Sequence, residues 1–273
     1  MLCTLKEAAG LAKQAGHGLA AFNVFGYEDA AAVICAAEKT DRPVVLMTNK
    51  LAVEHMGIPI LAQMLRYMAE RAAVPVCVHL DHATELEKIR EAAEWGYTSV
   101  VIDGSGLPFD ENVAITREAA AIAHPRGISV EGEIGSVGYS DHKEVHGRFT
   151  EPDEAEKFAK ISGVDALAVA VGTVHRMEEQ GVDLQFDRLR EIYSRVDVPL
   201  VIHGSTGVAD ADLKKLVQAG ACKINMGTVL RMTFGHSMRK QLERDPALFD
   251  RIKIFQNCMK DVEKKAIDKI KCL

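Results

Sequence analysis

Short apolar runs recur along the chain, and longer segments with helical periodicity separate them. The separating segments include EDAAAVICAAEKT, ELEKIREAAEWG, ENVAITREAAAIAH and ADLKKLVQAG. Short strands that alternate with helices are typical of βα units and a parallel sheet. The pattern therefore predicts eight strands, at 19–24, 43–48, 75–80, 99–103, 129–133, 166–172, 199–204 and 222–227.

Eight βα units in a chain of this length match a single (β/α)8 barrel. We expect one domain over residues 1–273, with a short amphipathic helix at the N-terminus and a helical extension at the C-terminus. A doubly wound sheet is the alternative architecture. It is disfavoured because no G-x-G-x-x-G follows the first strand, where the dinucleotide sites of that fold require it.

Polar side chains stand at the ends of the predicted strands. In (β/α)8 barrels the carboxyl ends of the strands meet on one rim, and active sites form there. We therefore expect a catalytic or binding site on that rim. Its predicted members are Asn23, Thr48, Asp81, His82, Asp103, Glu133, His175, His203 and Asn225.

The stretch VPVCVHLDHATELEKIR, residues 74–90, changes from an apolar strand to charged groups within a few positions. Asp81 lies between His79 and His82, and Thr84 precedes Glu87 by three residues, a spacing that predicts a helix N-cap. These polar groups could satisfy one another in a loop, or they could form part of a reaction site. The polar residues at the other strand ends favour a reaction site.

Three of the ten histidines stand at strand ends: His82, His175 and His203. The others lie in helical or connecting segments or in a polar loop, and His79 is expected to pack or hydrogen bond inside the barrel. Three neutral imidazoles around an open fourth position form a catalytic zinc site. A hydrogen-bonded polar cluster without a metal is the alternative.

Two glycine-containing loops follow the seventh and eighth strands. HGSTG spans 203–207 and NMGT spans 225–228, and helical sequence follows each loop. Barrels often bind phosphate with these two loops and a helix N-terminus. The small residues, backbone N–H groups and hydroxyls of the loops therefore predict a phosphate site.

Composition and charge narrow the class of protein. With 48% hydrophobic and 26% charged residues, the chain is typical of a globular protein. Its net charge of −6 disfavours nucleic acid or an anionic membrane as a partner. Six scattered cysteines without CxxC spacing predict free thiols in a reducing cytoplasm. Charged residues interrupt the apolar positions of residues 1–16, so we expect neither a signal peptide nor a membrane-spanning helix there.

Six motifs spread over nearly the whole chain carry a family resemblance: AFNV, HLDHATELEKIREAAEWGYTSVVIDGS, VEGEIGSVG, GVDALAVAVGTVH, VIHGSTG and KINMGT. Together they resemble the class II, metal-dependent ketose-bisphosphate aldolases, which include fructose- and tagatose-bisphosphate aldolases. The block 79–105 is the most specific. The resemblance implies Zn²⁺ and the reversible cleavage of a phosphorylated ketose into a dihydroxyacetone-phosphate-like donor and an aldehyde.

The resemblance also implies catalytic roles. The three strand-end histidines match the zinc ligands, and the metal would stabilise the ene-diolate that forms on carbon–carbon cleavage. Asp81 matches the group that moves a proton to or from the hydroxyl that becomes the aldehyde. Asn225 would hold the ene-diolate, and Glu133 would lie near the metal.

Substrate-binding residues follow from the same resemblance. Backbone and hydroxyl groups that match Gly204, Thr206 and Thr228 hold the donor phosphate in the family, often beside a monovalent cation such as Na⁺ or K⁺. The substrate-facing residues that we expect are Asn23, Lys50, Gly172, Arg176, Gly204, Ser205, Thr206, Asn225, Gly227 and Thr228.

The chain departs from the family pattern where the substrate would lie. Arg176 replaces a common glycine, and Lys50 stands where Ser or Gly is more usual. The loop SVGYSDHKEVHG lacks the usual Gly-Gly segment and proton-transfer glutamate, for which Asp141 is the candidate replacement. The stretch IKIFQNCMKDVEKKAIDKI contains no arginine for a distal phosphate. We therefore expect fructose 1,6-bisphosphate to be a poorer substrate than a ketose 1-phosphate.

The expected function is a zinc-dependent class II aldolase that acts on a small sugar phosphate and forms a homodimer or homotetramer. Two alternatives stay open. One is a zinc-assisted hydrolase or isomerase that uses metal-bound water on the same barrel. The other is a non-catalytic sugar-phosphate-binding barrel, which Asp81 disfavours because binding alone does not require that acid.

Overall fold

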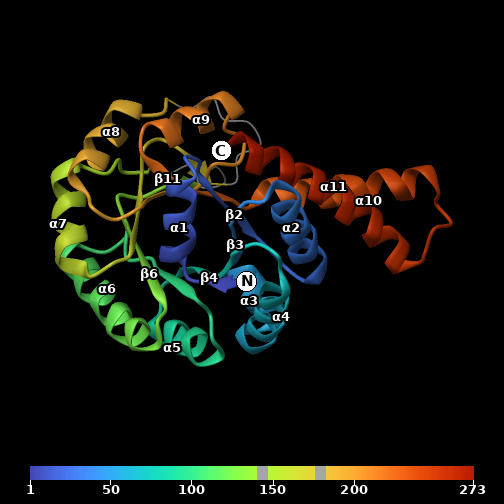
Figure 1. Cartoon of the computed structure of the whole chain (residues 1–273), viewed down its shortest axis with the longest axis horizontal. Coiled ribbons are helices and arrows are strands. Elements are labelled where there is room, and N and C mark those ends of the chain that lie inside the picture. Colours follow the sequence, from blue (N-terminus) through green and yellow to red (C-terminus); the bar gives the residue numbers. More distant parts are fainter. Residues whose placement is uncertain (140–146, 176–182) are drawn as a thin grey trace.

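Eight parallel strands close into a barrel in the computed structural model of the chain (Figure 1). The structure describes residues 1–139, 147–175 and 183–273. The barrel strands are, in order around the ring, β2 (Leu19–Asn23), β3 (Val44–Thr48), β4 (Val76–Ala83), β5 (Ser99–Ile102), β6 (Ser129–Ile134), β8 (Ala166–Val169), β10 (Leu200–Ile202) and β11 (Ala221–Met226). β11 pairs with β2 and closes the ring. The predicted (β/α)8 architecture is confirmed.

Helices surround the barrel and connect its successive strands (Figure 1). The longer helices bury an apolar stripe against the sheet, as α5 does with Ile89, Ala92 and Ala93 at helical spacing. The connecting helices are α2 (Tyr27–Thr40), α3 (Lys50–Met56), α4 (Ile58–Arg71), α5 (Leu86–Trp95), α6 (Phe109–Ala123), the 3₁₀ turn η1 (His124–Arg126), α7 (Pro152–Ser162), α8 (Phe186–Arg195) and α9 (Asp210–Gln218).

The core has two layers because successive strand residues point to opposite sides of the sheet. On β2 and β3, Phe22 and Leu46 pack toward the helices, whereas Ala21 and Val45 fill the barrel interior. The strands are buried along almost their whole length. This explains why the strands appear in the sequence as continuous apolar runs and not as alternating patterns.

One helix covers the amino-terminal end of the barrel. α1 (Leu5–Gln14) lies across the ring in Figure 1, and its buried residues Leu5, Ala8, Ala9 and Ala12 join the interior layer. A capping box between Thr4 and Glu7 begins the helix. With this end closed, the opposite end, where the strand carboxyl termini lie, is left for a site.

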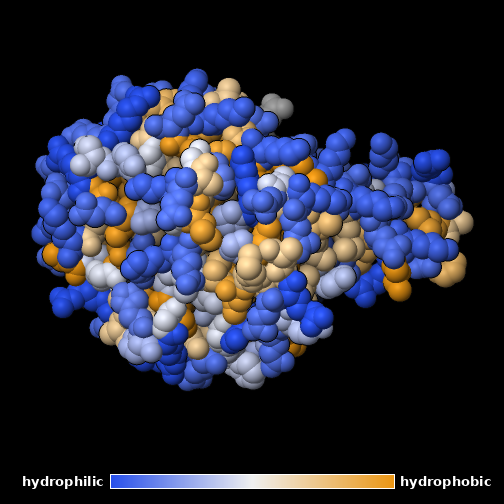
Figure 2. Space-filling model, viewed as in Figure 1, coloured by the Kyte–Doolittle hydropathy of each residue, from blue (hydrophilic) through white to orange (hydrophobic). Residues whose placement is uncertain are grey.

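The two C-terminal helices form a hairpin that projects from the barrel. α10 (Thr228–Arg244) and α11 (Arg251–Cys272) lie side by side in Figure 1 and extend well beyond the ring. The surface view shows hydrophobic residues among hydrophilic ones at the end of this projection (Figure 2). Phe249 is 93% exposed there and Ile252 is 68% exposed.

Local details differ from the expectations. The predicted N-cap at Thr84 is wrong: β4 continues to Ala83, and α5 begins after Glu85 without a side-chain cap. A two-residue strand, β1 (Leu2–Cys3), pairs with β4 before α1. Beyond the barrel, β7 (Gly138–Tyr139) pairs with β9 (Val174–His175). Among the described residues, each helix is too short or too polar to cross a membrane.

Candidate active site

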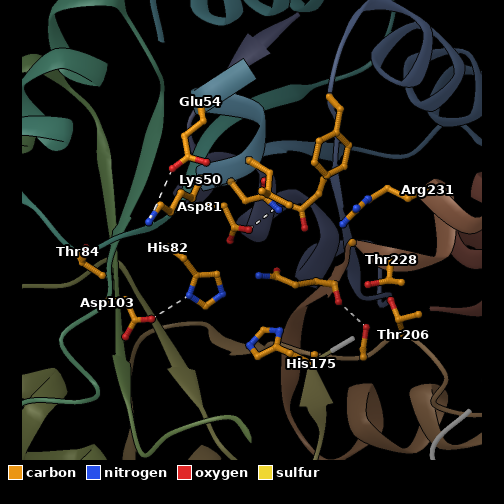
Figure 3. A pocket seen from close by; sticks show the side chains of 18 residues that line it. Lys50, Glu54, Asp81, His82, Thr84, Asp103, His175, Thr206, Thr228 and Arg231 are labelled. Carbon is orange, nitrogen blue, oxygen red and sulfur yellow. Dashed lines mark hydrogen bonds and ion pairs between the residues drawn. The ribbon is translucent and has the colours of Figure 1, made fainter. Parts of the chain in front are cut away.

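A cavity of about 600 Å³ opens at the carboxyl end of the barrel (Figure 3). Its wall combines strand ends with the loops and helix starts that follow them. The residues on the wall are Asn23, Phe25, Asn49, Lys50, Leu51, Glu54, Asp81, His82, Thr84, Asp103, His175, Gly204, Ser205, Thr206, Asn225, Gly227, Thr228 and Arg231. The site thus lies on the rim that the strand ends predicted.

The three strand-end histidines converge on one point of this cavity. The ring centroids of His82 and His203 are 4.6 Å apart, and that of His175 lies 5.2 Å from His82. One nitrogen from each ring lies within 4.8 Å of the other two. His203 is fully buried at the base of the cluster, whereas His82 and His175 line the cavity. The described residues therefore include a triad that could hold a metal ion.

An irregular turn at the end of β4 brings two adjacent residues into the same cavity. Consecutive strand residues normally point to opposite faces. Here the register with β5 shifts between Leu80 and Ala83, and His82 adopts a left-handed φ of 53°. Such bulges redirect side chains at barrel rims. Asp81 and His82 consequently both face the site. This explains why the strand ends in a carboxylate beside an imidazole.

Carboxylates behind the triad determine which nitrogens face forward. Asp103 Oδ2 lies 3.0 Å from His82 Nδ1, and Glu131 Oε1 lies 2.7 Å from His203 Nε2. Burial raises the pKa of Asp103, but the hydrogen bond and charge of His82 and the hydrogen bonds from Ser105 together outweigh burial and hold that pKa below its usual range. An ionised carboxylate only accepts hydrogen bonds, so these two ring nitrogens donate. In a neutral ring the lone pair is then on the other nitrogen, which is Nε2 in His82 and Nδ1 in His203.

The facing lone pairs fit a bound cation. His82 Nε2 and His203 Nδ1 are 3.1 Å apart in a buried setting, so a proton or a metal ion must lie between them to offset their repulsion. Burial lowers the pKa of His82, but Asp81, Asp103 and Glu133 outweigh it and raise the pKa to about 10. Carboxylate-supported histidines of this kind are typical of zinc sites.

Glu133 lies directly against the triad. Its Oε2 is 3.4 Å from His203 Nδ1 and 3.8 Å from His82 Nδ1, and it is buried without a hydrogen-bond partner among the described residues. Burial, followed by the nearby Asp103 carboxylate, raises the pKa of Glu133 to about 7. A buried oxygen without a partner beside ring nitrogens is a further sign that a cation belongs here.

Asp81 is held next to the triad with one oxygen available. Asn23 Nδ2 donates to Asp81 Oδ2 at 2.8 Å, while Asp81 Oδ1 has no partner within the described part of the chain. Burial raises the pKa of Asp81, but His82, His203 and His79 and the hydrogen bond from Asn23 together outweigh burial and lower that pKa. The carboxylate is therefore ionised and can accept a proton from a bound molecule.

Small residues allow the loops after β10 and β11 to approach the site. A Cβ on Gly204, whose φ is 65°, would lie 2.9 Å from the carbonyl carbon of Val174, beside the backbone of His175. A Cβ on Gly227 would lie 2.5 Å from Asn23 Oδ1. Either side chain would therefore displace a neighbour that the site needs.

The two loops are also joined by a hydrogen bond. Ser205 Oγ donates to the backbone oxygen of Asn225 at 2.5 Å, so this hydroxyl connects the loops. The Asn225 side chain lines the cavity, and its Oδ1 lacks a partner among the described residues. α10 begins at Thr228, which places the N-terminus of a long helix at the cavity wall.

The two ends of the cavity carry different charged groups. Figure 3 shows Arg231, Thr206 and Thr228 together on the right of the cavity, and Lys50 and Glu54 together at the upper left, above His82. Lys50 Nζ lies 3.8 Å from Glu54 Oε1. The Arg231 guanidinium also stacks over the Phe25 ring, at 5.0 Å. One end is therefore cationic beside a helix N-terminus, and the other carries a matched ion pair.

The predicted site residues mostly meet in this cavity. Gly172 does not line it, and with a φ of 108° it lies against the backbone of Asp183. Glu133 and His203 lie behind the wall, in contact with residues that form it. Arg176 and Asp141 lie outside the described residues. His79 is buried inside the barrel as expected, with Nδ1 2.8 Å from Ser99 Oγ.

Sequence reasoning missed three participants. Arg231 stands one turn after Thr228 in α10, a spacing that could have indicated it. Glu54 follows Lys50 at i+4, which is also readable on a helix. Glu131 alternates with Glu133 on β6, and this spacing could have placed both on the interior face of the barrel.

The fold and the cavity together define a class of protein. A (β/α)8 barrel with a carboxylate-supported histidine triad, an ionised aspartate beside it and a helix N-terminus at one end has groups that could hold a metal ion and an anionic small molecule.

Comparisons with known proteins specify the family. The family model described as fructose-bisphosphate aldolase class-II matches residues 3–273. A fructose-bisphosphate aldolase of Giardia intestinalis is 35% identical, covering 91% of this chain and 85% of the relative. One of Geobacillus stearothermophilus is also 35% identical, covering 93% and 90%. The chain belongs to the class II fructose-bisphosphate aldolase family, as its motifs predicted.

A solved structure agrees in fold and sequence. The crystal structure of the YdjI aldolase from Escherichia coli K12 matches with a TM-score of 0.88 and 33% identity, covering 100% of this chain and 97% of that one. The protein is a class II aldolase, a carbon–carbon lyase that cleaves a phosphorylated ketose.

Proposed function

We propose that this aldolase binds Zn²⁺ through His82, His175 and His203 and uses Asp81 as its acid/base. The observation that carries the proposal is the geometry of the triad. His82 and His203 direct nitrogens toward each other at 3.1 Å, while Asp103 and Glu131 engage their outer nitrogens. Burial, with the neighbouring imidazoles, lowers the pKa of His175 to about 3, so this ligand is neutral at physiological pH. Neutral imidazoles are good zinc ligands.

The reaction that we propose starts at Asp81. When bound, the metal ion would act as a Lewis acid toward the carbonyl of the ketose. Asp81 accepts the proton of the hydroxyl that becomes the aldehyde, and Asn23 holds the other carboxylate oxygen in place. As the new C=O bond forms, the adjacent carbon–carbon bond breaks and its electron pair stays on the donor fragment. Protonation of the donor carbon then completes the cleavage.

Two further groups serve this step in the proposal. Asn225 lines the cavity and would hydrogen bond the donor fragment while it carries negative charge. Glu133, buried beside His82 and His203, would balance the charge of the metal site or coordinate the ion. Asp141 is our candidate for the acid that protonates the donor carbon.

We assign the donor phosphate to the end of the cavity formed by the loops after β10 and β11. Gly204, Thr206, Gly227 and Thr228 line this end, and Arg231 adds a guanidinium. A helix N-terminus and backbone N–H groups suit an anion here. The proposal includes a monovalent cation, Na⁺ or K⁺, beside the phosphate. Replacing both ions with choline in the assay tests this part of the proposal.

We assign the aldehyde fragment to the opposite end. Lys50 and Glu54 there form an ion pair at 3.8 Å, so a second phosphate would meet a carboxylate as well as an ammonium. An uncharged polyhydroxylated end suits this environment better than a phosphate. The substrate that we propose is therefore a ketose 1-phosphate, with fructose 1,6-bisphosphate cleaved less well.

A metal-depletion experiment tests the function. The purified enzyme is treated with a chelator, and cleavage of a panel of ketose phosphates is followed by release of dihydroxyacetone phosphate before and after Zn²⁺ is restored. We expect activity to disappear and return with about one Zn²⁺ per chain. Release of inorganic phosphate, or isomerisation without cleavage, would instead support a hydrolase or an isomerase.

We also propose that the enzyme is a homo-oligomer, a dimer or a tetramer, in a reducing cytoplasm. The projecting hairpin of α10 and α11 supports the first part, because a largely exposed Phe249 at its end is costly to leave in water. Six cysteine thiols support the second part, since all are unpaired.

A further inference from the structure

A buried ion pair lies inside the barrel beneath the proposed metal site. Lys223 on β11 is fully buried, and its Nζ lies 2.8 Å from Glu131 Oε2 on β6. Glu131 is also fully buried, and its other oxygen, Oε1, lies 2.7 Å from His203 Nε2. A continuous series of charge-assisted contacts thus connects Lys223, through Glu131, to His203 of the triad.

Each contact in this series fixes the orientation of the next residue. A carboxylate buried in an apolar interior requires a partner charge, and the Lys223 ammonium supplies it. The ion pair holds the Glu131 carboxylate in one orientation, with Oε1 directed at the imidazole of His203. His203 Nε2 must then carry the ring hydrogen, which leaves Nδ1 as the lone pair that faces His82 at 3.1 Å.

Stability alone does not explain the pair. An isolated buried ion pair is often no more stabilising than apolar residues of the same size. The barrel interior also contains apolar residues such as Ala21, Val45 and Ala168, which show that this layer accepts apolar side chains. The connection to His203 gives the pair a use that an apolar replacement could not provide.

We propose that Lys223 is a positioning residue that, through Glu131, fixes the ring hydrogen of His203 on Nε2 and so prepares Nδ1 to bind the metal. The proposal builds on the zinc site of the preceding section. Removing the hydrogen-bond partner that supports a metal-binding histidine typically lowers metal affinity by about 10–100-fold. Lys223 acts one step further out than the usual partner.

Lys223→Met tests this role, because methionine has a similar length and no charge. Long-range ¹H–¹⁵N spectra of zinc-free protein with labelled histidine report which nitrogen of His203 carries hydrogen. We expect Nε2–H alone in the wild type and a mixture of both forms in the variant. Competition with a chromogenic chelator is expected to show about 10–100-fold weaker zinc binding.

Two variants control for general damage to the core. Ile224→Val removes a methylene from the next residue, which packs toward the helices, and should lower the melting temperature without changing zinc affinity. In the double variant Lys223→Met with Glu131→Gln, the amide oxygen can still accept from His203 Nε2 and no unpaired charge remains. We expect it to recover the Nε2–H form and most of the zinc affinity.

The outcomes separate the possible roles. If Lys223→Met keeps the wild-type ring form and zinc affinity while only its melting temperature falls, Lys223 is merely structural and the proposal fails. If Lys223→Met does not fold, Lys223→Gln replaces it, and unchanged ring form and affinity in that variant overturn the proposal. The position of the ring hydrogen on His203 is measured without zinc. A wild type that binds no zinc would therefore contradict the zinc proposal, but the ring-hydrogen measurement would still test the role of Lys223.

Discussion

At the scale of single residues, the site depends on how three imidazoles and one carboxylate are oriented. His82 faces the cavity because the backbone turns left-handed at that position, and Asp81 stays beside it with one oxygen unpaired among the described residues. The outer nitrogens of His82 and His203 are engaged by carboxylates. Each orientation therefore has an identifiable cause, and each can be removed separately.

Replacing a histidine of the triad with alanine should remove metal and activity together. We expect His82→Ala, His175→Ala and His203→Ala each to lose bound Zn²⁺ and cleavage, because two imidazoles seldom suffice for a catalytic zinc site. Elemental analysis and circular dichroism measure metal content and folding. A triple alanine variant that keeps a full complement of zinc would exclude this site.

Asp81→Asn should separate catalysis from metal binding. The amide preserves the shape of the carboxylate and can still pair with Asn23, but it cannot accept the substrate proton. We expect zinc content to be retained and kcat to fall by about 10²–10⁴-fold. Steady-state kinetics with elemental analysis check both quantities. Turnover close to that of the wild type would make Asp81 a structural residue.

At the scale of elements, two helices that begin at the rim divide the cavity. α10 brings Thr228 and Arg231 to one end, and α3 brings Lys50 and Glu54 to the other. In our proposal the helix after the eighth strand supplies the anion-binding end, as is common in this fold. The helix after the second strand, in the order around the ring, supplies the groups that would meet the aldehyde fragment.

Substrate preference should follow the charges on α3. A phosphate that lacks a charge-assisted contact loses about 1.5–3 kcal/mol of favourable interaction free energy. We therefore expect fructose 1,6-bisphosphate to have a kcat/KM about 10–150-fold below that of the best ketose 1-phosphate. Parallel kinetics on both substrate types measure it. If the bisphosphate exceeds every monophosphate, our assignment of this end is wrong.

Variants of the ion pair refine that comparison. Glu54→Gln frees the Lys50 ammonium, so kcat/KM for the bisphosphate should rise by up to about fivefold, the scale of an exposed charge contact. Lys50→Met should lower it by a similar factor. In both variants, kcat/KM for substrates with an unphosphorylated acceptor end should stay almost unchanged. These substrates serve as the internal control.

At the scale of the whole molecule, the barrel is closed at one end by α1 and extended on one side by the hairpin of α10 and α11 (Figure 1). The hairpin joins the site to the periphery, because α10 starts at the cavity wall and ends near the exposed Phe249. An exposed apolar tip of this kind suits contact with another protein surface.

Phe249→Ser should weaken the proposed self-association. Burying a phenylalanine side chain is worth about 1.5–3 kcal/mol, so the variant should dissociate at higher concentration than the wild type. Sedimentation velocity over a dilution series measures the shift. Lys240→Ser, at an exposed position of the same hairpin, is the matched control. A wild type that sediments as a monomer at all concentrations would refute the oligomer.

Much of the fold was predictable because local physics determines it. Apolar runs that alternate with amphipathic segments define βα units, and the carboxyl ends of parallel strands share one rim. His82, Asp81, Glu133, His203 and Asn225 could be assigned to that rim from their places in the chain. The family resemblance added their chemical roles.

What the tertiary structure alone decided is how those residues are oriented and supported. His82 and His203 are 121 positions apart, and Lys223 lies 92 positions from Glu131, so no local pattern records which nitrogen or oxygen faces which. The bulge at His82, the ion pair behind His203 and the approach of Arg231 to the cavity depend on how the strands close into a ring. Periodicity in a sequence specifies faces and ends, whereas hydrogen-bond partners at the centre of a barrel are determined only when distant strands meet.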